Sequence, residues 1–193
     1  LAHAAGLVGD PQVRHMGTIG GSVAHGDPVS DEPAVLLALD ARFVLAGPGG
    51  GRREARASGS PGFFRGFFET DVRPGEVLVE IRVPKPAAGT GWSYRKFTRR
   101  AQDFALVGVA CLAGPSNGAT GWAVAMAGMG LTPIRATAVE EALAGGADAG
   151  SAARHAADGT TPPSDTFGSS EYRRHLAGVM TRRSLEEAMA RRG

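Results

Sequence analysis

The sequence contains a single cysteine, Cys111, among its 193 residues. One thiol can form no internal disulfide, and it cannot supply the several thiolates that an iron–sulfur cluster needs. A lone cysteine is typical of a reducing compartment, and no signal-peptide pattern is present. We therefore expect a cytoplasmic protein in which Cys111, inside the run ALVGVACLAG, is a small core side chain.

Long apolar runs and an excess of one charge are also lacking. No apolar stretch approaches the roughly 20 residues that span a bilayer, so we expect no integral membrane protein. Lys and Arg total 21 against 19 Asp and Glu, and this near balance argues against nucleic acid as the main partner. A hydrophobic content of 42 % fits a globular chain of one large or two small domains.

An initial methionine is missing too. The chain opens on LAHAAGLVGDPQ, a pattern typical of the last turns of a helix that ends at Gly6 or Gly9. This start predicts a fragment of a longer protein.

The first predicted region spans residues 1–86. A helix is expected from Asp31 to Asp40, with Ser30 or Asp31 as its N-cap. RFVLAG and GRREARAS predict a strand pair around a glycine loop, and EVLVEIRVP predicts a further strand. The spacing of four phenylalanines predicts a short buried helical turn, at Phe63, Phe64, Phe67 and Phe68.

The second predicted region spans residues 87–193 and follows a linker-like KPAAGTG. Three strands are expected, in WSYRKFTRR, DFALVGVACLAG and GWAVAMAGMG; continuous apolarity indicates a strand covered on both faces, or alternatively a short helix. RATAVEEALAGG predicts a helix and SAARHAADGT a weaker one. A long amphipathic helix begins at Ser169 or Ser170, with a buried stripe of Leu176, Val179, Met180, Leu185 and Met189.

A glycine-rich stretch, RHMGTIGGSVAHGDP, predicts a strand, a tight glycine turn and another short strand. Backbone N–H groups at Gly20 and Gly21, beside the hydroxyls of Thr18 and Ser22, suit an anion such as a diphosphate. An ordinary turn is the alternative. The stretch matches neither the dinucleotide fingerprint nor a P-loop.

Other candidate sites are weaker. His25 and Asp27 are two residues apart, so an extended strand would place both on one side like metal ligands; the alternative is a polar loop without a third ligand. The sequence offers no Ser-His-Asp set and no defensible pair of carboxylates. Redox chemistry would therefore come from a bound cofactor.

The stretch GDPQVRHMGTIGGSVAHGDPVSDEPAVLLALDA resembles the second flavin-binding motif of the molybdenum hydroxylase FAD subunits. These are the medium subunits of the carbon monoxide dehydrogenase and xanthine dehydrogenase family. The resemblance continues in order through LVEIRVP, YRKFTRRAQDFALVGVA, PIRATAVEEALAG and SSEYRRHLAGVMTRRSLEEAM. It therefore covers essentially the whole chain.

The resemblance implies an α+β fold. Residues 1–86 would form the second half of a vanillyl-alcohol-oxidase-type FAD-binding domain. Residues 87–193 would form a smaller α+β domain with a three-stranded antiparallel sheet and helices. The family also carries an earlier glycine motif of the AGG-[HQ]-S type, which the 193 residues do not include. We therefore expect the chain by itself to bind FAD weakly or not at all.

The resemblance also implies cofactor-binding residues. The segment that would wrap the FAD pyrophosphate is Thr18, Ile19, Gly20, Gly21 and Ser22. Asp31 matches an acid that hydrogen-bonds the adenosine side, with a helix N-cap as its alternative role. Leu78 matches a position whose backbone touches the adenine, and its alternative is a core strand leucine. Arg95 falls where some relatives place a lysine near the cofactor.

A basic pair, Arg99 and Arg100, resembles one that lies near the isoalloxazine in xanthine-oxidising relatives. Acidic residues follow the pair there, whereas Ala101 and Gln102 precede Asp103 in this sequence. The alternative is a solvated strand end.

The function implied is that of an oxidoreductase subunit that binds FAD and transfers electrons. Electrons would pass from a molybdopterin large subunit through an iron–sulfur small subunit to this flavin, and then to an external acceptor. The alternative is a flavin-free scaffold module of the same complex. The substrate would be chosen by the molybdenum subunit.

Overall fold

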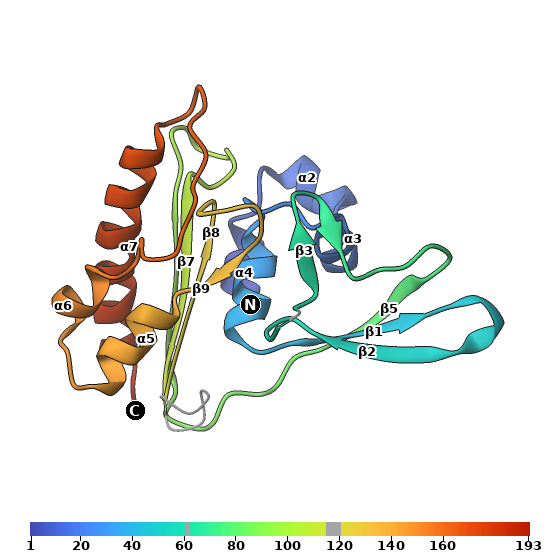
Figure 1. Cartoon of the computed structure of the whole chain (residues 1–193), viewed down its shortest axis with the longest axis horizontal. Helices are drawn as coiled ribbons and strands as arrows, with labels where there is room; N and C mark the ends of the chain where they lie inside the picture. The colour runs from blue at the N-terminus through green and yellow to red at the C-terminus, as the bar shows by residue number, and fades with distance from the viewer. Residues whose placement is uncertain (61, 115–120) are drawn as a thin grey trace.

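The computed structural model describes residues 1–60, 62–114 and 121–193. Within these ranges the chain is α+β, and every paired strand is antiparallel. A layer of helices and a sheet form one side of the molecule, and a narrow sheet extends away from them (Figure 1). No helix in the described ranges combines the length and the apolarity needed to cross a membrane.

Short helices open the chain: α1 (Ala2–Gly6), α2 (Pro11–Met16) and α3 (Ile19–His25). The prediction of strand, glycine turn and strand is therefore wrong. Side-chain caps explain the difference, because Asp10 accepts a hydrogen bond from the amide of Val13, and Thr18 accepts one from the amide of Gly21, each at 2.9 Å. Such caps initiate helices even where glycines lower the helix propensity.

Helix α4 (Asp31–Ala38) follows with Ser30 at its N-cap, as predicted. It ends two residues before the expected end, because Asp40 adopts a left-handed backbone conformation with φ of +51°. All its residues except Glu32 are buried, since the helix lies between two layers of structure.

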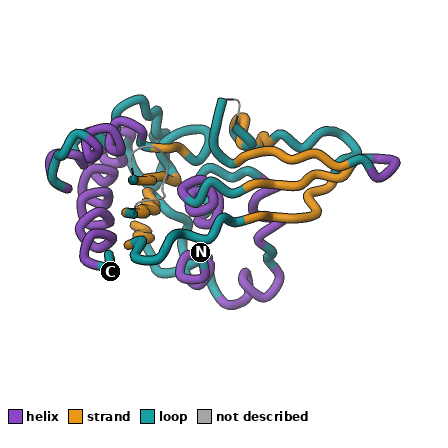
Figure 2. The backbone as a smooth tube through the Cα atoms, turned by 90° about the horizontal axis from the view of Figure 1, so that it is seen from below, coloured by secondary structure: helices purple, strands orange, loops and turns teal. Residues whose placement is uncertain are grey.

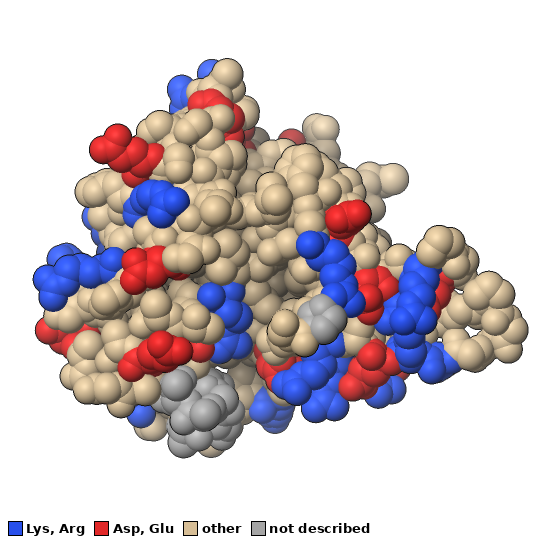
Figure 3. All heavy atoms as spheres, viewed as in Figure 1, with Lys and Arg blue, Asp and Glu red and all other residues tan. Residues whose placement is uncertain are grey.

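A three-stranded sheet forms an arm, ordered β2–β1–β5. Its strands are β1 (Arg42–Ala46), β2 (Arg52–Arg56) and β5 (Val77–Arg82), and the turn between β1 and β2 holds a 3₁₀ helix, η1 (Pro48–Gly50). All three strands are confirmed. Figure 2 shows that the arm extends away from the helices, and Figure 3 shows basic and acidic side chains together on its surface.

The phenylalanine-rich segment forms a small hairpin, β3 (Phe64–Gly66) and β4 (Glu69–Thr70), so the predicted buried helical turn is wrong. Phe63 is fully buried against Phe43, with 4.4 Å between ring centroids. Phe68 lies in the turn with φ of +56°, and it is 44 % exposed. The hairpin turn thus separates the second phenylalanine pair from the core.

The second region is built on a sheet ordered β6–β7–β8–β9. The three predicted strands are confirmed as β6 (Gly91–Phe97), β7 (Val107–Ala113) and β8 (Trp122–Ala127). A two-residue strand, β9 (Ile134–Arg135), adds a fourth strand beyond the three expected. Strand β7 is buried along its whole length, as its continuous apolarity predicts.

Helices cover one face of this sheet: α5 (Thr137–Ala144), α6 (Ala149–Ala153) and α7 (Ser170–Ala190). Ser169 caps α7 by accepting a hydrogen bond from the amide of Tyr172 at 3.1 Å. Of the predicted stripe, Leu176, Met180 and Leu185 are buried, and the other two residues are half-buried.

The other face of the sheet packs against α4 of the first region. Leu36 and Val35 join Ala110, Leu112 and Ala125 in one apolar cluster. Cys111 is fully buried on β7, and burial raises the pKa of its thiol to about 12. Because α4 belongs to both layers, the two regions share a core.

Candidate functional site

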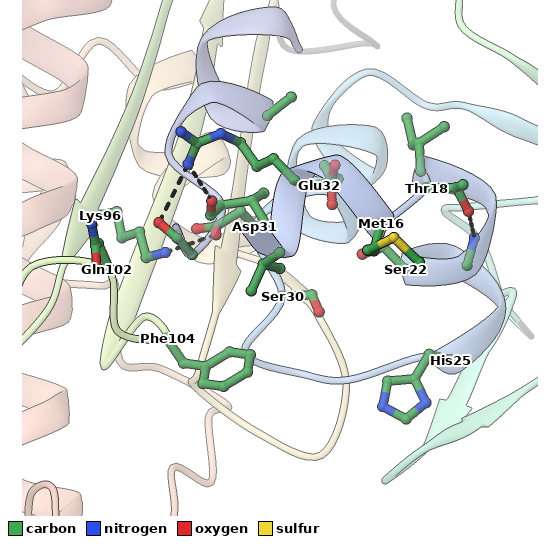
Figure 4. A pocket seen from close by; sticks show the side chains of 18 of the residues that line it. Met16, Thr18, Ser22, His25, Ser30, Asp31, Glu32, Lys96, Gln102 and Phe104 are labelled. Atoms are coloured by element: carbon green, nitrogen blue, oxygen red, sulfur yellow. Dashed lines mark hydrogen bonds and ion pairs between the residues drawn. The ribbon is translucent and has the colours of Figure 1, made fainter. Parts of the chain in front are cut away.

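A cavity of about 720 Å³ lies beside helices α2 and α3, within the size range of ligand sites. Its walls come from the turn between α1 and α2, from α2 and α3, from the start of α4, from β6 and from the β6–β7 loop. Figure 4 shows side chains from these separate elements facing one space. The segments lie far apart in sequence, so only the fold brings them together.

The wall formed by α3 contains most of the predicted pyrophosphate segment. Thr18, Ile19, Gly21 and Ser22 line the cavity, and Gly20 is half-buried between them without lining it. The first N–H groups of a helix have no partner within the helix, and the dipole makes this end positive. The start of a helix thus faces the cavity where the sequence predicted a glycine turn.

Asp31 lies at the start of α4 and lines the same cavity. Its carboxylate, only 5 % exposed, accepts hydrogen bonds from the Tyr94 hydroxyl and from Lys96 Nζ, the latter at 2.8 Å. Burial raises the pKa of Asp31, and the bonds from Lys96 and Tyr94 offset part of that rise. Burial and the neighbouring Asp31 carboxylate raise the pKa of Tyr94 well above its usual value.

Lys96 was not predicted from the sequence. Its ammonium group also donates to the Leu7 carbonyl at 3.0 Å, so it joins β6, the start of α4 and the end of α1. The period-two alternation of β6 could have identified it, because Tyr94 and Lys96 point to one face of the strand.

Arg95 points to the opposite face of β6. Its guanidinium forms an ion pair with Glu187 of α7, with 2.8 Å between Nε and Oε2, and it does not line the cavity. Leu78 lies on β5 opposite Leu45, half-buried, and it is also absent from the cavity wall. The structure therefore brings Asp31 together with the pyrophosphate segment, but it separates Arg95 and Leu78 from them.

The β6–β7 loop, residues 98–106, closes another side of the cavity. Gln102, Asp103 and Phe104 line it, with Gln102 at a left-handed φ of +71°. Phe104 is 70 % exposed although it faces the cavity. The basic pair at the start of the loop is exposed, and Arg99 donates to the Thr166 carbonyl at 2.8 Å.

The suggested metal ligands do not share an extended strand. His25 ends α3 and its ring contacts Phe68, with 4.7 Å between centroids. Asp27 lies in the following turn and accepts a hydrogen bond from the Val29 amide at 3.0 Å. Within the part of the chain that the structure describes, no three His, Cys, Asp or Glu side chains are grouped to hold a metal ion.

Apolar side chains complete the wall. Val13, Met16 and Ile19 line the cavity from α2 and α3, and Met16 is 87 % exposed. The arrangement combines a positive helix end, a buried carboxylate with two donors, and apolar surface reaching Phe104. It suits a ligand that has an anionic part and flat, apolar ring systems.

Family models match nearly the whole chain. Residues 1–86 match the model described as "FAD binding domain in molybdopterin dehydrogenase". Residues 92–188 match the model described as "CO dehydrogenase flavoprotein C-terminal domain".

Known relatives match over the same length. The chain is 42 % identical to the carbon monoxide dehydrogenase medium chain of Hydrogenophaga pseudoflava over 196 residues, which cover 99 % of this chain and 67 % of the relative. It is 37 % identical to the glyceraldehyde dehydrogenase medium chain of Sulfolobus acidocaldarius over 192 residues, which cover 97 % of this chain and 66 % of that relative. The chain spans about two thirds of the length of these curated relatives.

A solved structure shares the fold. The carbon monoxide dehydrogenase of Hydrogenophaga pseudoflava, in a form that lacks the Mo-pyranopterin moiety of the molybdenum cofactor, superposes with a TM-score of 0.89 at 42 % identity. The match covers 100 % of this chain and 67 % of the solved one. With its two family models and these relatives, the chain belongs to the flavoprotein medium-chain family of the molybdopterin dehydrogenases.

Proposed function

We propose that the chain is the FAD-binding, electron-transferring part of a molybdopterin-dependent dehydrogenase, and that the cavity beside α3 holds part of the FAD. One observation carries the proposal. The Thr18–Ser22 segment, which matches the family's flavin loop, forms the first turn of a helix that faces a large cavity together with the buried Asp31.

The residues present fit an FAD in two respects. A diphosphate needs N–H donors and hydroxyls, and the first turn of α3 offers the amides of Ile19 and Gly20, which have no partner within the helix, beside the hydroxyls of Thr18 and Ser22. Gly21, which lines the cavity, also leaves the backbone uncovered there because it has no side chain. Backbone can therefore approach a ligand closely at this point.

Asp31, Tyr94 and Lys96 would orient the ligand and balance its charge. The pair between Asp31 and Lys96 holds two charges in a buried position, with side chains 6 % and 7 % exposed. An FAD hydroxyl or ring nitrogen that reaches Asp31 would meet a carboxylate already held by two donors. Bound FAD supplies the redox chemistry, and these residues supply a fixed position and a fixed field.

The partners and the location follow as part of the proposal. An iron–sulfur small subunit and a molybdopterin large subunit would deliver electrons, and an external acceptor would remove them. The single cysteine supports this division, since a cluster needs several thiolates. The same lone thiol supports a cytoplasmic location. Leu78 and Arg95 remain predicted cofactor contacts outside the cavity wall.

The experiment is a titration of FAD into the 193-residue chain, followed by flavin fluorescence. We expect saturable but weak binding, because the family's earlier glycine motif is not among these residues. Ser22→Asp places a carboxylate beside the diphosphate, and repulsion should weaken binding by about 100-fold. An acidic residue in the first turns of α3 also favours the helix, so folding is preserved.

Ser22→Asn is the matched control, because asparagine has nearly the same size as aspartate but carries no charge. We expect it to bind within about threefold of the parent chain. Equal FAD affinity in the Ser22→Asp and Ser22→Asn variants would contradict the position assigned to the diphosphate. No saturable binding in any variant would favour the flavin-free scaffold instead.

A further inference from the structure

The β6–β7 loop is held from the side opposite the cavity. The Leu106 amide donates to the Phe97 carbonyl at 2.8 Å, which closes the base of the loop. The Leu106 carbonyl accepts a hydrogen bond from Nη1 of Arg173 at 2.6 Å. Arg173 lies near the start of α7 and is only 3 % exposed. An internal guanidinium therefore fixes the end of the loop that carries Phe104.

Arg173 is itself held in place. Its Nη2 donates to Oδ2 of Asp165 at 2.7 Å. The other oxygen of Asp165 accepts from the amides of Phe167 and Gly168 at 2.8 and 3.0 Å. The turn before α7 thus orients the carboxylate, and the carboxylate orients the guanidinium.

The backbone of Gly128 lies close to the same carbonyl. Gly128 has a φ of +78°, and a Cβ built on it would lie 2.3 Å from the Leu106 oxygen. The Gly128 amide donates to the Pro28 carbonyl at 2.9 Å, in the turn that leads to Asp31. Only a glycine fits at this position. The segment after β8 therefore packs closely against the end of the β6–β7 loop and is hydrogen-bonded to the turn before α4.

We propose that Arg173 is a positioning residue for the flavin site: through the Leu106 carbonyl it holds the wall of Gln102, Asp103 and Phe104 against the cavity. The inference rests on the proposed function, because the wall matters only if a ligand meets it. Arg99 adds a second tie to the same turn through the Thr166 carbonyl. Two arginines, Arg99 and Arg173, therefore link the β6–β7 loop to the turn before α7 and to the start of α7 by hydrogen bonds.

Arg173→Met removes the tie while keeping an apolar stem. Arg174→Met is the matched control, because Arg174 donates to the carbonyls of Ala157 and Thr160 and has no hydrogen bond to the loop. In the ligand-free chain, we expect hydrogen exchange of residues 98–106 to accelerate about tenfold in Arg173→Met alone. Amides of β7 and of the last turns of α7 should keep their protection.

The second measurement is the FAD titration of the same variants. Arg173→Met should weaken binding by about tenfold and reduce the quenching of the bound flavin, with Arg174→Met unchanged. Arg173→Lys should restore only part of the FAD affinity and of the flavin quenching, because a lysine ammonium lacks the planar fork that holds the Leu106 carbonyl and Asp165 together. If Arg173→Met folds poorly, Asp165→Asn tests the same tie with Arg173 left in place, and it should shift both readouts in the same direction.

The outcomes separate the two proposals. Unchanged exchange of residues 98–106 in Arg173→Met overturns the inference, and so does an equal loss of protection in β7 and α7, which indicates a purely structural role. Altered loop exchange with unchanged FAD affinity and quenching also overturns it. If the parent chain binds no FAD while the loop still responds to Arg173→Met, the proposed function fails and the loop tie stands.

Discussion

The two larger sheets of the molecule, β6–β9 and the arm, are stabilised by different kinds of interaction. The β6–β9 sheet is covered on both faces, by α5–α7 on one and by α4 on the other, and β7 has no exposed residue. The arm of β2, β1 and β5 has buried residues mainly on its central strand. Apolar burial therefore dominates in the β6–β9 sheet, and charge pairs take part of that role in the arm.

The arm carries those charge pairs along its outer strands. Arg53 of β2 contacts Asp71 and both carboxylate oxygens of Glu76, and Arg82 of β5 pairs with Glu54. Charged side chains on edge strands also discourage pairing with other chains. The same antiparallel architecture should thus respond to core mutations in one region and to acid and salt in the other.

The largest difference should appear in thiol reactivity. Burial raises the pKa of the Cys111 thiol to about 12, so a thiol reagent at pH 8 should label it only after the β6–β9 sheet opens. A cysteine introduced by Val79→Cys on the arm occupies a position that is 47 % exposed, and it should react freely. We expect labelling rates that differ by about a thousandfold or more. Similar labelling rates for the two cysteines would show that the β6–β9 sheet opens readily.

A core truncation should have the next largest effect. Leu185 of α7 is fully buried against the β6–β9 sheet, and Leu185→Ala should lower the free energy of unfolding by about 2–5 kcal/mol. Val77→Ala on the arm, where the side chain is 63 % exposed, should change it by less than about 0.5 kcal/mol. Urea unfolding of both variants checks this, and comparable losses would contradict the proposed difference between the sheets.

Arg53→Met should have a smaller effect that depends on pH. At neutral pH we expect a loss of about 1 kcal/mol in the free energy of unfolding, because the guanidinium is only partly shielded from water. Hydrogen bonds from Arg53 lower the pKa of Glu76 from 4.5 to about 2. A lowered pKa means that the stabilisation is present above pH 4.5 and is lost as the pH falls towards 2.

An NMR titration of the Glu76 carboxyl group measures this directly. In Arg53→Met the midpoint should return towards the ordinary glutamate value, and unfolding of the arm should lose that part of its acid dependence. Glu80 is a matched reference, because its pKa is lowered by Arg82 and not by Arg53. A shift of both carboxyl groups in the variant would contradict a local network.

The smallest effect is expected at an exposed pair. Arg42 and Glu54 are 3.2 Å apart with side chains 49 % and 33 % exposed. Arg42→Ala should lower the free energy of unfolding by less than about 0.5 kcal/mol, and the difference should vanish in 1 M salt. Thermal unfolding at low and high salt provides the test. A loss as large as that of Arg53→Met would mean that the arm's charges act as one network.

Elements with strong local signals could be predicted from the sequence. The continuous apolar run of β7 predicts burial on both faces, and α7 has a capping serine and an apolar stripe. The glycine-rich stretch was predicted wrongly, because the caps at Asp10 and Thr18 outweigh the low helix propensity of Gly20 and Gly21. The phenylalanine segment failed because a tight hairpin turn interrupts its helical spacing.

The candidate site could be predicted only in part. The Thr18–Ser22 segment and Asp31 are each recognisable from neighbouring residues, and both line the cavity except for Gly20. Lys96 lines the cavity and was not predicted, whereas Arg95 points to the other face of β6 and stays a predicted cofactor contact. Adjacent residues of a strand point to opposite faces, so only the fold shows which cation of the Arg95–Lys96 pair lines the cavity.

The sequence by itself determined the fold class and the family, because these depend on local pattern and residue type. Tertiary structure alone decided which groups meet. Asp31 is held by Tyr94 and Lys96, 63 and 65 positions away, and Arg173 reaches the Leu106 carbonyl across 67. The physical reason is that such contacts form only after strands and helices pack, and packing also excludes the water that would otherwise weaken each charge.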